Sequence, residues 1–181
     1  MKKALRLSAA GVAMAAAMGM SSAAHADNAD ATATAEILEA LTLDLVTDTS
    51  LDFGAMVISA EPGVDSTVSL AADGTLDCDD ANVTCSGTTG VPTFNVGGTA
   101  DKAVTVSLPT ADIELTHTNT VSTIELSDLV TDAADNADGD PEVTLDEDGA
   151  ASFSVGGTIT IESDDPAGIY TGSFNVSVEY S

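Results

Sequence analysis

Aromatic residues are scarce in this 181-residue chain, which has no Trp, two Tyr and four Phe. Stacking on a sugar or a nucleobase needs an aromatic face. Recognition of sugars by ring stacking is therefore disfavoured, and Tyr170 and Tyr180 are the only tyrosines that could provide it.

Basic residues are also few, and they are unevenly placed. Lys102 is the only Lys or Arg after Ala26, whereas all 30 acidic residues follow Ala26. Nucleic acid is excluded as a partner because phosphate binding needs cations. An anionic membrane surface is excluded for the same reason. This charge is typical of a solvated, self-repelling and soluble surface, with a Ca²⁺-dependent protein as the alternative.

The first 26 residues have the three parts of a signal peptide. A basic start is followed by an apolar stretch from Leu7 to Met20 and by the small-x-small pattern Ala24-His25-Ala26. The apolar stretch is too short for a membrane anchor, and Asp27, rather than a lipidated Cys, follows the predicted cut. We therefore expect residues 1–26 to be removed and residues 27–181 to form one domain without membrane insertion. The destination would be the periplasm, the cell surface or the exterior.

Cys78 and Cys85 are the only cysteines. An exported chain enters an oxidising compartment, so the pair predicts a disulfide that closes a small polar loop. A metal site is disfavoured there because no further Cys or His lies nearby.

Strict alternation of apolar and polar residues is the main structural signal. It is clearest from Tyr170 to Tyr180, which we expect to form one long strand. Residues 31–45 repeat it, with apolar residues at odd positions and Glu39 as the exception. A helix over Ala35–Leu45 is the competing prediction because Ala, Glu and Leu favour helices, but the interspersed Thr residues favour a strand.

Short apolar runs separated by turn residues fill the region between these two ends. We expect strands within 51–58, 67–71, 93–96, 103–108, 113–116, 121–126, 143–145, 151–155 and 158–161. Asp73-Gly74 and Asp148-Gly149 predict hairpin turns. The Gly pairs in Phe94-Asn95-Val96-Gly97-Gly98-Thr99 and Phe153-Ser154-Val155-Gly156-Gly157-Thr158 predict bends or bulges. About ten short strands and no convincing helix indicate an all-β fold, an antiparallel β-sandwich of immunoglobulin-like type.

Motifs for catalysis are missing from the sequence. His117 is the only histidine after residue 26, and we expect it to be a partly exposed sheet residue. Neither a Gly-x-Ser-x-Gly elbow nor a phosphate-binding loop occurs. The 30 acidic residues supply many accidental carboxylate pairs, so such pairs do not indicate glycosidic chemistry. We expect no enzymatic activity.

Calcium is the one cofactor that the sequence makes worth testing. Asp135, Asp138 and Asp140 are candidate ligands around Gly139. The segment is not an EF-hand, because Ala134 and Leu145 would stand at its first and twelfth positions. A looser oxygen cage and a solvated acidic loop are the two remaining interpretations.

Four segments resemble an uncharacterised family of secreted bacterial proteins, domain-of-unknown-function family 4402. They are Ala31-Thr32-Ala33-Thr34-Ala35, Leu51-Asp52-Phe53-Gly54, Phe153-x-Val155-Gly156-Gly157-Thr158, and Gly168-x-Tyr170-Thr171-Gly172-x-Phe174-x-Val176-x-Val178-x-Tyr180. These are strand and corner residues, so the resemblance implies a fold and assigns no catalytic residue.

The same outline resembles, more distantly, chaperone–usher pilins. In those proteins an incomplete sandwich is completed by the N-terminal extension of the next subunit, a form of β-augmentation. The resemblance implies self-assembly or strand donation between subunits, with Ala31–Ile37 as the extension.

Together these features predict an exported, non-enzymatic β-sandwich that serves as a surface or fimbria-like structural subunit. The alternative is a soluble periplasmic or secreted binding module, either with or without a dependence on Ca²⁺.

Overall fold

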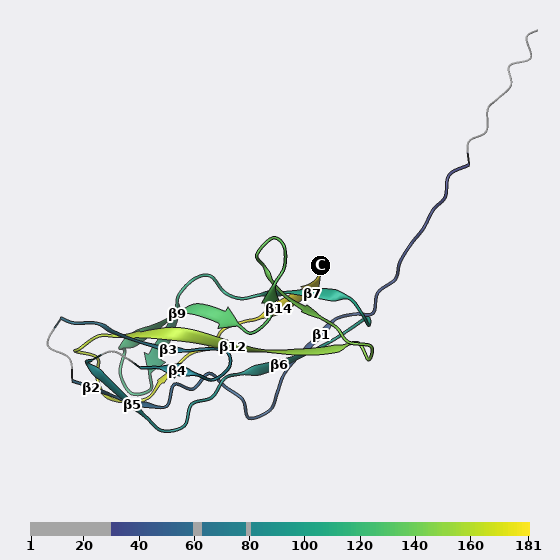
Figure 1. Ribbon diagram of the computed structural model, residues 1–181. Helices are drawn as coiled ribbons and strands as arrows, with labels where there is room; N and C mark the ends of the chain where they lie inside the picture. Colours follow the sequence, from purple (N-terminus) through teal and green to yellow (C-terminus); the bar gives the residue numbers. More distant parts are fainter. Residues whose placement is uncertain (1–29, 60–62, 79–80) are drawn as a thin grey trace, which may run out of the picture. The chain divides into compact units, whose positions relative to one another are not determined.

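A computed structural model describes residues 30–59, 63–78 and 81–181, and in these ranges the chain forms strands, turns and loops (Figure 1). The predicted signal peptide, residues 1–26, lies outside the described residues. No helix long and apolar enough to cross a membrane occurs in the described ranges. The chain divides into two units, residues 1–36 and 37–181. Residues 30–36 of the first unit are exposed and have no regular secondary structure, and every strand lies in the second.

The strands are short, with two exceptions. In chain order they are β1 (Thr42–Leu45), β2 (Ala55–Ile58), β3 (Ser66–Leu70), β4 (Leu76–Asp77), β5 (Val83–Ser86), β6 (Thr93–Gly97), β7 (Ala103–Ser107), β8 (Ile113–His117), β9 (Thr123–Thr131), β10 (Ala134–Asp135), β11 (Pro141–Thr144), β12 (Ala150–Ile161), β13 (Tyr170–Thr171) and β14 (Ser177–Tyr180).

The strands form three antiparallel sheets. The largest follows the path β1-β6-β12-β9-β8-β13, with β3 and β4 attached to β12. A second sheet has the order β10-β11-β7-β14, and β2 pairs with β5 in a third. The predicted all-β antiparallel β-sandwich is thus confirmed, while its immunoglobulin-like or pilin-like detail stays a prediction.

Strand β12 is the centre of the largest sheet (Figure 1). Its first half pairs with β6, from Ala150 opposite Gly97 to Ser154 opposite Thr93. Its second half pairs with β3 from Gly157 to Ile161, and with β9 along the other edge. The sequence predicted two separate strands here, 151–155 and 158–161. That prediction is wrong, because the chain runs straight through Gly156-Gly157 and only its partner changes.

The predicted irregularity at Gly156-Gly157 is present as a register shift between β12 and β9. Gly156 lies opposite Val130 and Thr158 opposite Ser127, so the additional residue belongs to β9. Asp128, within this step, has a left-handed φ of 46°. Gly156 on β12 is needed for a separate, steric reason, because a Cβ there would collide with the backbone of Leu70 to Ala72.

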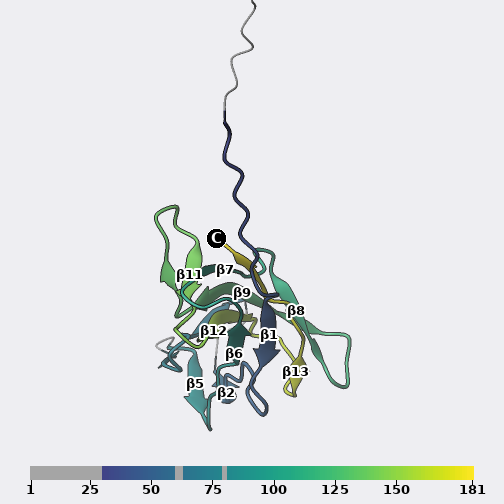
Figure 2. The same cartoon turned by 90° about the vertical axis from the view of Figure 1, so that its right-hand side faces the viewer.

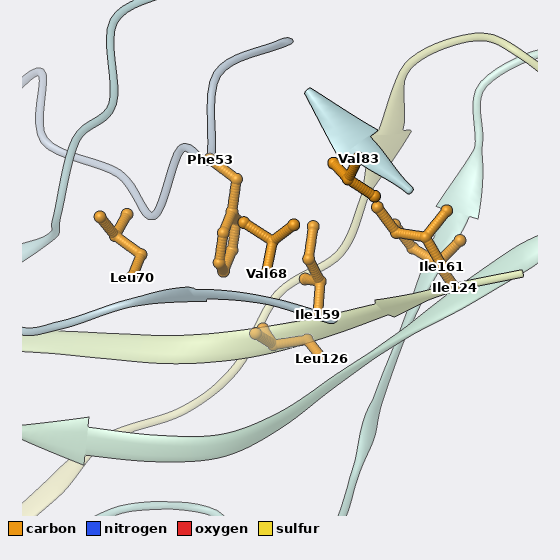
Figure 3. Packing of buried hydrophobic residues seen from close by; sticks show 8 residues of the cluster. All are labelled: Phe53, Val68, Leu70, Val83, Ile124, Leu126, Ile159 and Ile161. Atoms are coloured by element: carbon orange, nitrogen blue, oxygen red, sulfur yellow. The ribbon is translucent and has the colours of Figure 1, made fainter. Parts of the chain in front are cut away.

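Two clusters of buried apolar side chains form the core. The first joins β3, β5, β9 and β12 with Phe53 of the loop before β2 (Figure 3). The second surrounds Phe153, which is 1% exposed and stacks on Phe94 with ring centroids 5.4 Å apart. Alternation explains both clusters, because in β3 Val68 and Leu70 are buried, whereas Ser69 between them is half-buried and Thr67 before them is exposed.

The two ends of the chain differ from the sequence predictions. Between residues 30 and 45, only Thr42–Leu45 is a strand, so neither the helix nor a strand over the whole range is right. At the other end, the expected strand from Tyr170 to Tyr180 is divided into β13, which pairs with β8, and β14, which pairs with β7. Residues 172–176 between them belong to no strand.

The two predicted hairpins also have different outcomes. Asp73-Gly74 joins the antiparallel strands β3 and β4, with Gly74 at a φ of 85°. Asp146 to Gly149 does form a turn, closed by a hydrogen bond from the Gly149 N–H to the Asp146 carbonyl. The strands on either side nevertheless lie in different sheets, because β11 pairs with β7 and β12 with β6. The predicted hairpin is therefore wrong, although its turn is right.

The crowding at Gly156 predicts a specific loss of stability. In Gly156→Ala the new methyl group would meet backbone atoms at the end of β3 and directly after it, including the Ala71 carbonyl carbon at 2.6 Å, which cannot move without displacing the strand. We expect a loss of about 1–3 kcal/mol in the free energy of unfolding, measured by chemical denaturation. Gly157→Ala is the matched control, since its nearest contacts are side-chain ends of Leu126 and Leu129 at 3.0 Å. Equal losses in both variants would contradict this account.

Candidate functional site

An apolar groove of about 480 Å³ lies on the surface of the domain formed by residues 37–181. It lies where the segment from β1 to Phe53 approaches the segment that follows β13, and we call it the seam groove. Its lining residues are Leu45, Thr49, Ser50, Leu51, Asp52, Phe53, Pro92, Phe94, Leu115, Leu126, Tyr170, Thr171, Gly172, Ser173 and Phe174.

The seam groove lies between the two ends of the main sheet. Strands β1 and β13 are the first and last strands of the six-strand path, yet Leu45 of β1 and Tyr170 of β13 line the same groove. The sheet is therefore rolled, which brings β1 and β13 close together in the view of Figure 2. Each of them has one strand partner, β6 for β1 and β8 for β13. The remaining edge of each is free of strand pairing among the described residues.

The chain after β13 continues this free edge. Phe174 and Val176 are half-buried and pack against the core, whereas Ser173 and Asn175 are exposed. The alternation of a strand is thus kept through residues 172–176, although they belong to no ladder in the described chain. Gly172 packs closely on β8, because a Cβ there would lie 2.6 Å from Cδ2 of Leu115 and 3.0 Å from the Glu114 carbonyl oxygen.

The chemistry of the seam groove is that of a core surface. Asp52 supplies its only charged side chain, and one carboxylate oxygen already accepts a hydrogen bond from the Gly54 N–H at 2.9 Å. The remaining lining is mainly aliphatic and aromatic. Such a surface suits apolar side chains and free strand edges, and it offers no pair of groups for acid–base chemistry.

Tyr170 is held in the groove wall by its neighbours. Its hydroxyl donates to the Pro166 carbonyl at 2.8 Å, and its ring meets the edge of His117 with centroids 5.0 Å apart. Burial raises the pKa of the Tyr170 phenol, and the nearby Asp165 carboxylate raises it further. A neutral hydroxyl that donates to a carbonyl agrees with both effects.

His117 is buried, so its predicted partial exposure is wrong. Its Nδ1 accepts hydrogen bonds from the N–H groups of Asn119 and Thr120, at 2.9 and 3.0 Å. Its Nε2 therefore carries the proton and lies 3.2 Å from the Ala167 carbonyl oxygen. Gly168 packs directly against the imidazole, leaving no space for a side chain. With both nitrogens engaged, His117 ties the β8–β9 turn to the loop before β13.

The predicted calcium ligands are dispersed around a turn. Oδ1 of Asn136 accepts hydrogen bonds from the N–H groups of Asp138 and Asp140, at 2.9 and 3.0 Å, and these bonds fix the shape of the loop. Asp140 also lines a second hollow of about 500 Å³ with Asp112 and Asp128, which Asp135 and Asp138 do not reach. In the described parts of the chain, no three His, Cys, Asp or Glu residues are grouped to hold a metal ion. Calcium binding at Asp135, Asp138 and Asp140 stays a prediction.

The predicted disulfide is present. Cys78 and Cys85 are bonded with their Cα atoms 6.2 Å apart, and both pack against the first core cluster. Cys85 lies on β5, where no strand was predicted. Because Cys78 directly follows β4 and β5 pairs with β2, the disulfide holds the β2–β5 sheet beside β4. This is a structural role.

A model of a known protein family matches residues 43–180. The chain belongs to the DUF4402 family, a domain of unknown function. The match covers every strand of the fold except the first residue of β1, and it confirms the resemblance inferred from the strand and corner residues. Comparison with curated proteins finds no match, and comparison with solved structures finds none either.

The groove residues were missed as a site by the sequence analysis. Leu45, Phe53, Phe94 and Phe174 alternate with polar residues in the way that core residues do, and nothing in the pattern separates a side chain in a core from one in a groove.

The disulfide predicts a moderate contribution to stability. Replacing both cysteines in Cys78→Ser/Cys85→Ser opens a loop with a sequence separation of 7. The entropy of closing such a loop amounts to about 2–3 kcal/mol, and we expect the free energy of unfolding to fall by this amount. The same fall should follow when the wild-type protein is unfolded in a reducing agent. A fully reduced protein of unchanged stability would contradict the expectation.

A cluster of acidic residues near the end of β12 predicts a stabilising substitution. Asp65, Asp164 and Asp165 raise the pKa of the exposed Glu162 carboxyl by repulsion, in that order of size. An acid whose folded pKa is raised destabilises the fold once it ionises, so stability should fall as pH rises through the ordinary range of a Glu. We expect Glu162→Gln to raise the melting temperature by about 1–3 °C at neutral pH.

The repulsion at Glu162 should be screened by salt, and the gain should shrink in about 0.5 M NaCl. Glu147→Gln is the matched control, an exposed Glu in the Asp146–Gly149 turn, outside this cluster. A gain that persists at high salt would contradict the electrostatic explanation.

Proposed function

We propose that this protein is an exported, non-enzymatic β-sandwich that serves as a surface or fimbria-like structural subunit, joined to its neighbours through its N-terminal extension. The observation that carries the proposal is the exposed alternating segment before β1. Residues 31–40 are all exposed, and the side chain of Ile37 is 93% exposed. An extended segment in which small apolar and polar residues alternate is the kind of segment that can add to a strand edge of a partner.

The point at which this extension leaves the sandwich is fixed. The Glu39 N–H donates to Oγ1 of Thr99 at 2.7 Å, and the Tyr180 hydroxyl donates to the Glu39 carbonyl at 2.9 Å. The same hydroxyl accepts the Thr99 N–H at 2.7 Å. Leu41, two residues later, packs against the second core cluster. These hydrogen bonds hold the chain to the domain directly after the proposed extension.

A non-enzymatic role agrees with the chemistry of the described residues. His117 has both ring nitrogens in hydrogen bonds to the backbone, and the seam groove contains a single carboxylate. Export rests on the signal peptide pattern of residues 1–26 and on a disulfide that suits an oxidising compartment. The periplasm, the cell surface and the exterior are all compatible with these features.

The seam groove also favours a second candidate, a soluble periplasmic or secreted module that binds an apolar ligand. A cavity of about 480 Å³ is within the range of small-molecule sites. A protein that stays monomeric and releases an apolar molecule on denaturation would support this candidate over the structural subunit. Its calcium-dependent form requires heat on titration with Ca²⁺.

We expect a variant that lacks residues 31–37 to fold normally but to lose the ability to assemble. The wild-type protein should form SDS-resistant ladders or filaments, seen by gel electrophoresis and by electron microscopy of the cell surface. The deletion variant should be exported, as judged by cell fractionation, but monomeric. Its melting temperature should stay within about 2 °C of wild type, because the deleted residues are exposed.

A length-preserving control separates the sequence of the extension from its mere presence. Thr32→Ser/Thr34→Ser keeps both the length and the apolar row, and it should assemble like wild type. A wild-type protein that is strictly monomeric on the cell surface would overturn the proposed function.

A further inference from the structure

Three Asp-Gly pairs stand in turns of the domain. They are Asp73-Gly74 between β3 and β4, Asp138-Gly139 between β10 and β11, and Asp148-Gly149 between β11 and β12. The three glycines have a left-handed φ of 85°, 90° and 75°. An Asp followed by Gly is chemically distinctive, because glycine has no side chain to shield its amide nitrogen from the side chain that precedes it. The three turns share this dipeptide but differ in how firmly the fold holds them.

We propose that Asp138-Gly139 is a modification site, at which the folded protein converts its aspartate to isoaspartate with water as the only reagent. The proposal concerns this turn alone and is independent of the proposed structural role.

The conversion has two steps. In the first, the Gly139 nitrogen bonds to Cγ of Asp138 while the bond from Cγ to the hydroxyl breaks, and the hydroxyl leaves with the amide proton as one water. The product is a cyclic succinimide. In the second, one water adds to a carbonyl carbon of the ring and breaks its bond to the nitrogen. Opening at Cγ restores aspartate, whereas opening at the main-chain carbonyl leaves the backbone running through Cβ and Cγ, which is isoaspartate.

The nitrogen of Gly139 is the most accessible of the three nucleophiles. Gly139 is exposed, whereas Gly74 is half-buried and Gly149 is buried. The Gly139 N–H donates to the Asn136 carbonyl at 3.2 Å, and the corresponding turn bonds of Gly74 and Gly149 are shorter, at 2.9 Å. The longer bond is the weaker one, so it opens more often and frees the nitrogen for attack.

Ring closure also requires the turn to change shape, and the surroundings of Gly149 oppose this. A Cβ built on Gly149 would collide with the Gly98 carbonyl oxygen, and the Gly149 carbonyl accepts a hydrogen bond from the Gly98 N–H at 2.9 Å. The turn of Asp148 is therefore fixed to the end of β6. A Cβ built on Gly139 would meet nothing within 4 Å.

Asp73 is restrained by its own carboxylate, although Gly74 also has open space around it. Its Oδ1 accepts a hydrogen bond from the Thr75 N–H at 2.8 Å, and hydrogen bonding to Thr75 lowers the pKa of the Asp73 carboxyl. Succinimide formation needs the neutral acid, because a carboxylate is a poor electrophile. The bonds that shape the turn of Asp138 go instead to Oδ1 of Asn136, from backbone N–H groups, and they leave the Asp138 carboxylate out.

Isoaspartate at this position would change the turn and leave the rest of the fold in place. It adds one carbon to the backbone between Asn136 and Asp140, whose N–H and carbonyl are joined at 2.8 Å across the turn, and this bond should be lost. Strands β10 and β11 pair through only two residue pairs, and β10 is the last strand of its sheet. The disturbance should therefore stay local.

Storage of the folded, disulfide-bonded exported chain in mildly acidic buffer tests the proposal. Isoaspartate is labelled with an isoaspartyl methyltransferase and quantified in the three Asp-Gly peptides by mass spectrometry. We expect it to appear at Asp138 about tenfold faster than at Asp73 or Asp148, because local opening of the turn controls the rate. Equal rates at the three sites, or a faster rate at Asp73 or Asp148, would overturn the inference.

The same chain, unfolded in urea with its disulfide reduced, is the matched control. Without the turns, the three sites should react within about threefold of one another. A tenfold preference for Asp138 that survives unfolding would assign the reactivity to local sequence and overturn the structural explanation.

A single substitution checks the assignment to Asp138. Asp138→Glu keeps the charge but can close only a larger, six-membered ring, so the label should disappear from this peptide and remain unchanged at Asp73 and Asp148. The melting temperature should stay within about 2 °C of wild type, because the position is exposed. Label that persists in the peptide of Asp138→Glu would contradict the assignment.

Discussion

The pairing of β12 is the interaction on which the rest of the structure depends. This strand pairs with β6 and then β3 along one edge and with β9 along the other. It also contributes Phe153 and Val155 to one core cluster and Ile159 and Ile161 to the other. β12 can run through both clusters as one strand only if it stays close to β3 at the point where its pairing changes from β6 to β3. The close approach of the Leu70 carbonyl makes Gly156 the residue that allows this.

The roll of the main sheet follows from that arrangement, and so does its incompleteness. The extra residue in β9, with Asp128 in the left-handed region, increases local twist in the way that bulges do. Twist brings β1 and β13 toward each other, but β14 then leaves to pair with β7 in the second sheet. Residues 172–176 are the crossing between two sheets. A strand edge and an apolar groove remain at the crossing, where no further strand of the described part of residues 37–181 pairs.

The alternation in the sequence was enough to predict which side of each strand is buried. It was not enough to predict which strands pair with each other. Residues 67–71 and 103–108 were recognised because one side of each strand is buried and the other is not. At Asp148-Gly149 the turn residues predicted a reversal correctly, but turn chemistry is local and carries no information about which sheet the next strand joins. From Tyr170 to Tyr180 the period of two persists while the partner changes from β8 to β7. Period alone does not reveal whether a backbone edge is paired.

The candidate site was hidden for a related reason. Phe94 and Phe174 belong to the apolar row of their segments, so the sequence presents them as core, and only the folded sheet shows that their row borders a groove. His117 illustrates the reverse error. Its surroundings in the sequence are polar, which suggested exposure, but its partners are backbone groups of Asn119, Thr120 and Ala167 that no side-chain pattern reveals.

The charge of the chain restricts the way in which copies could associate. With 30 acidic residues and Lys102 as the only basic one after residue 26, two copies repel each other, and salt bridges between them would be few. A contact made of backbone hydrogen bonds and small apolar side chains avoids this restriction, because it needs no charge of the opposite sign. Residues 31–37 contain one acidic residue, Glu36, and the seam groove contains Asp52 alone. The acidic surface would then keep finished assemblies apart, while the nearly uncharged extension would provide the contact between one copy and the next.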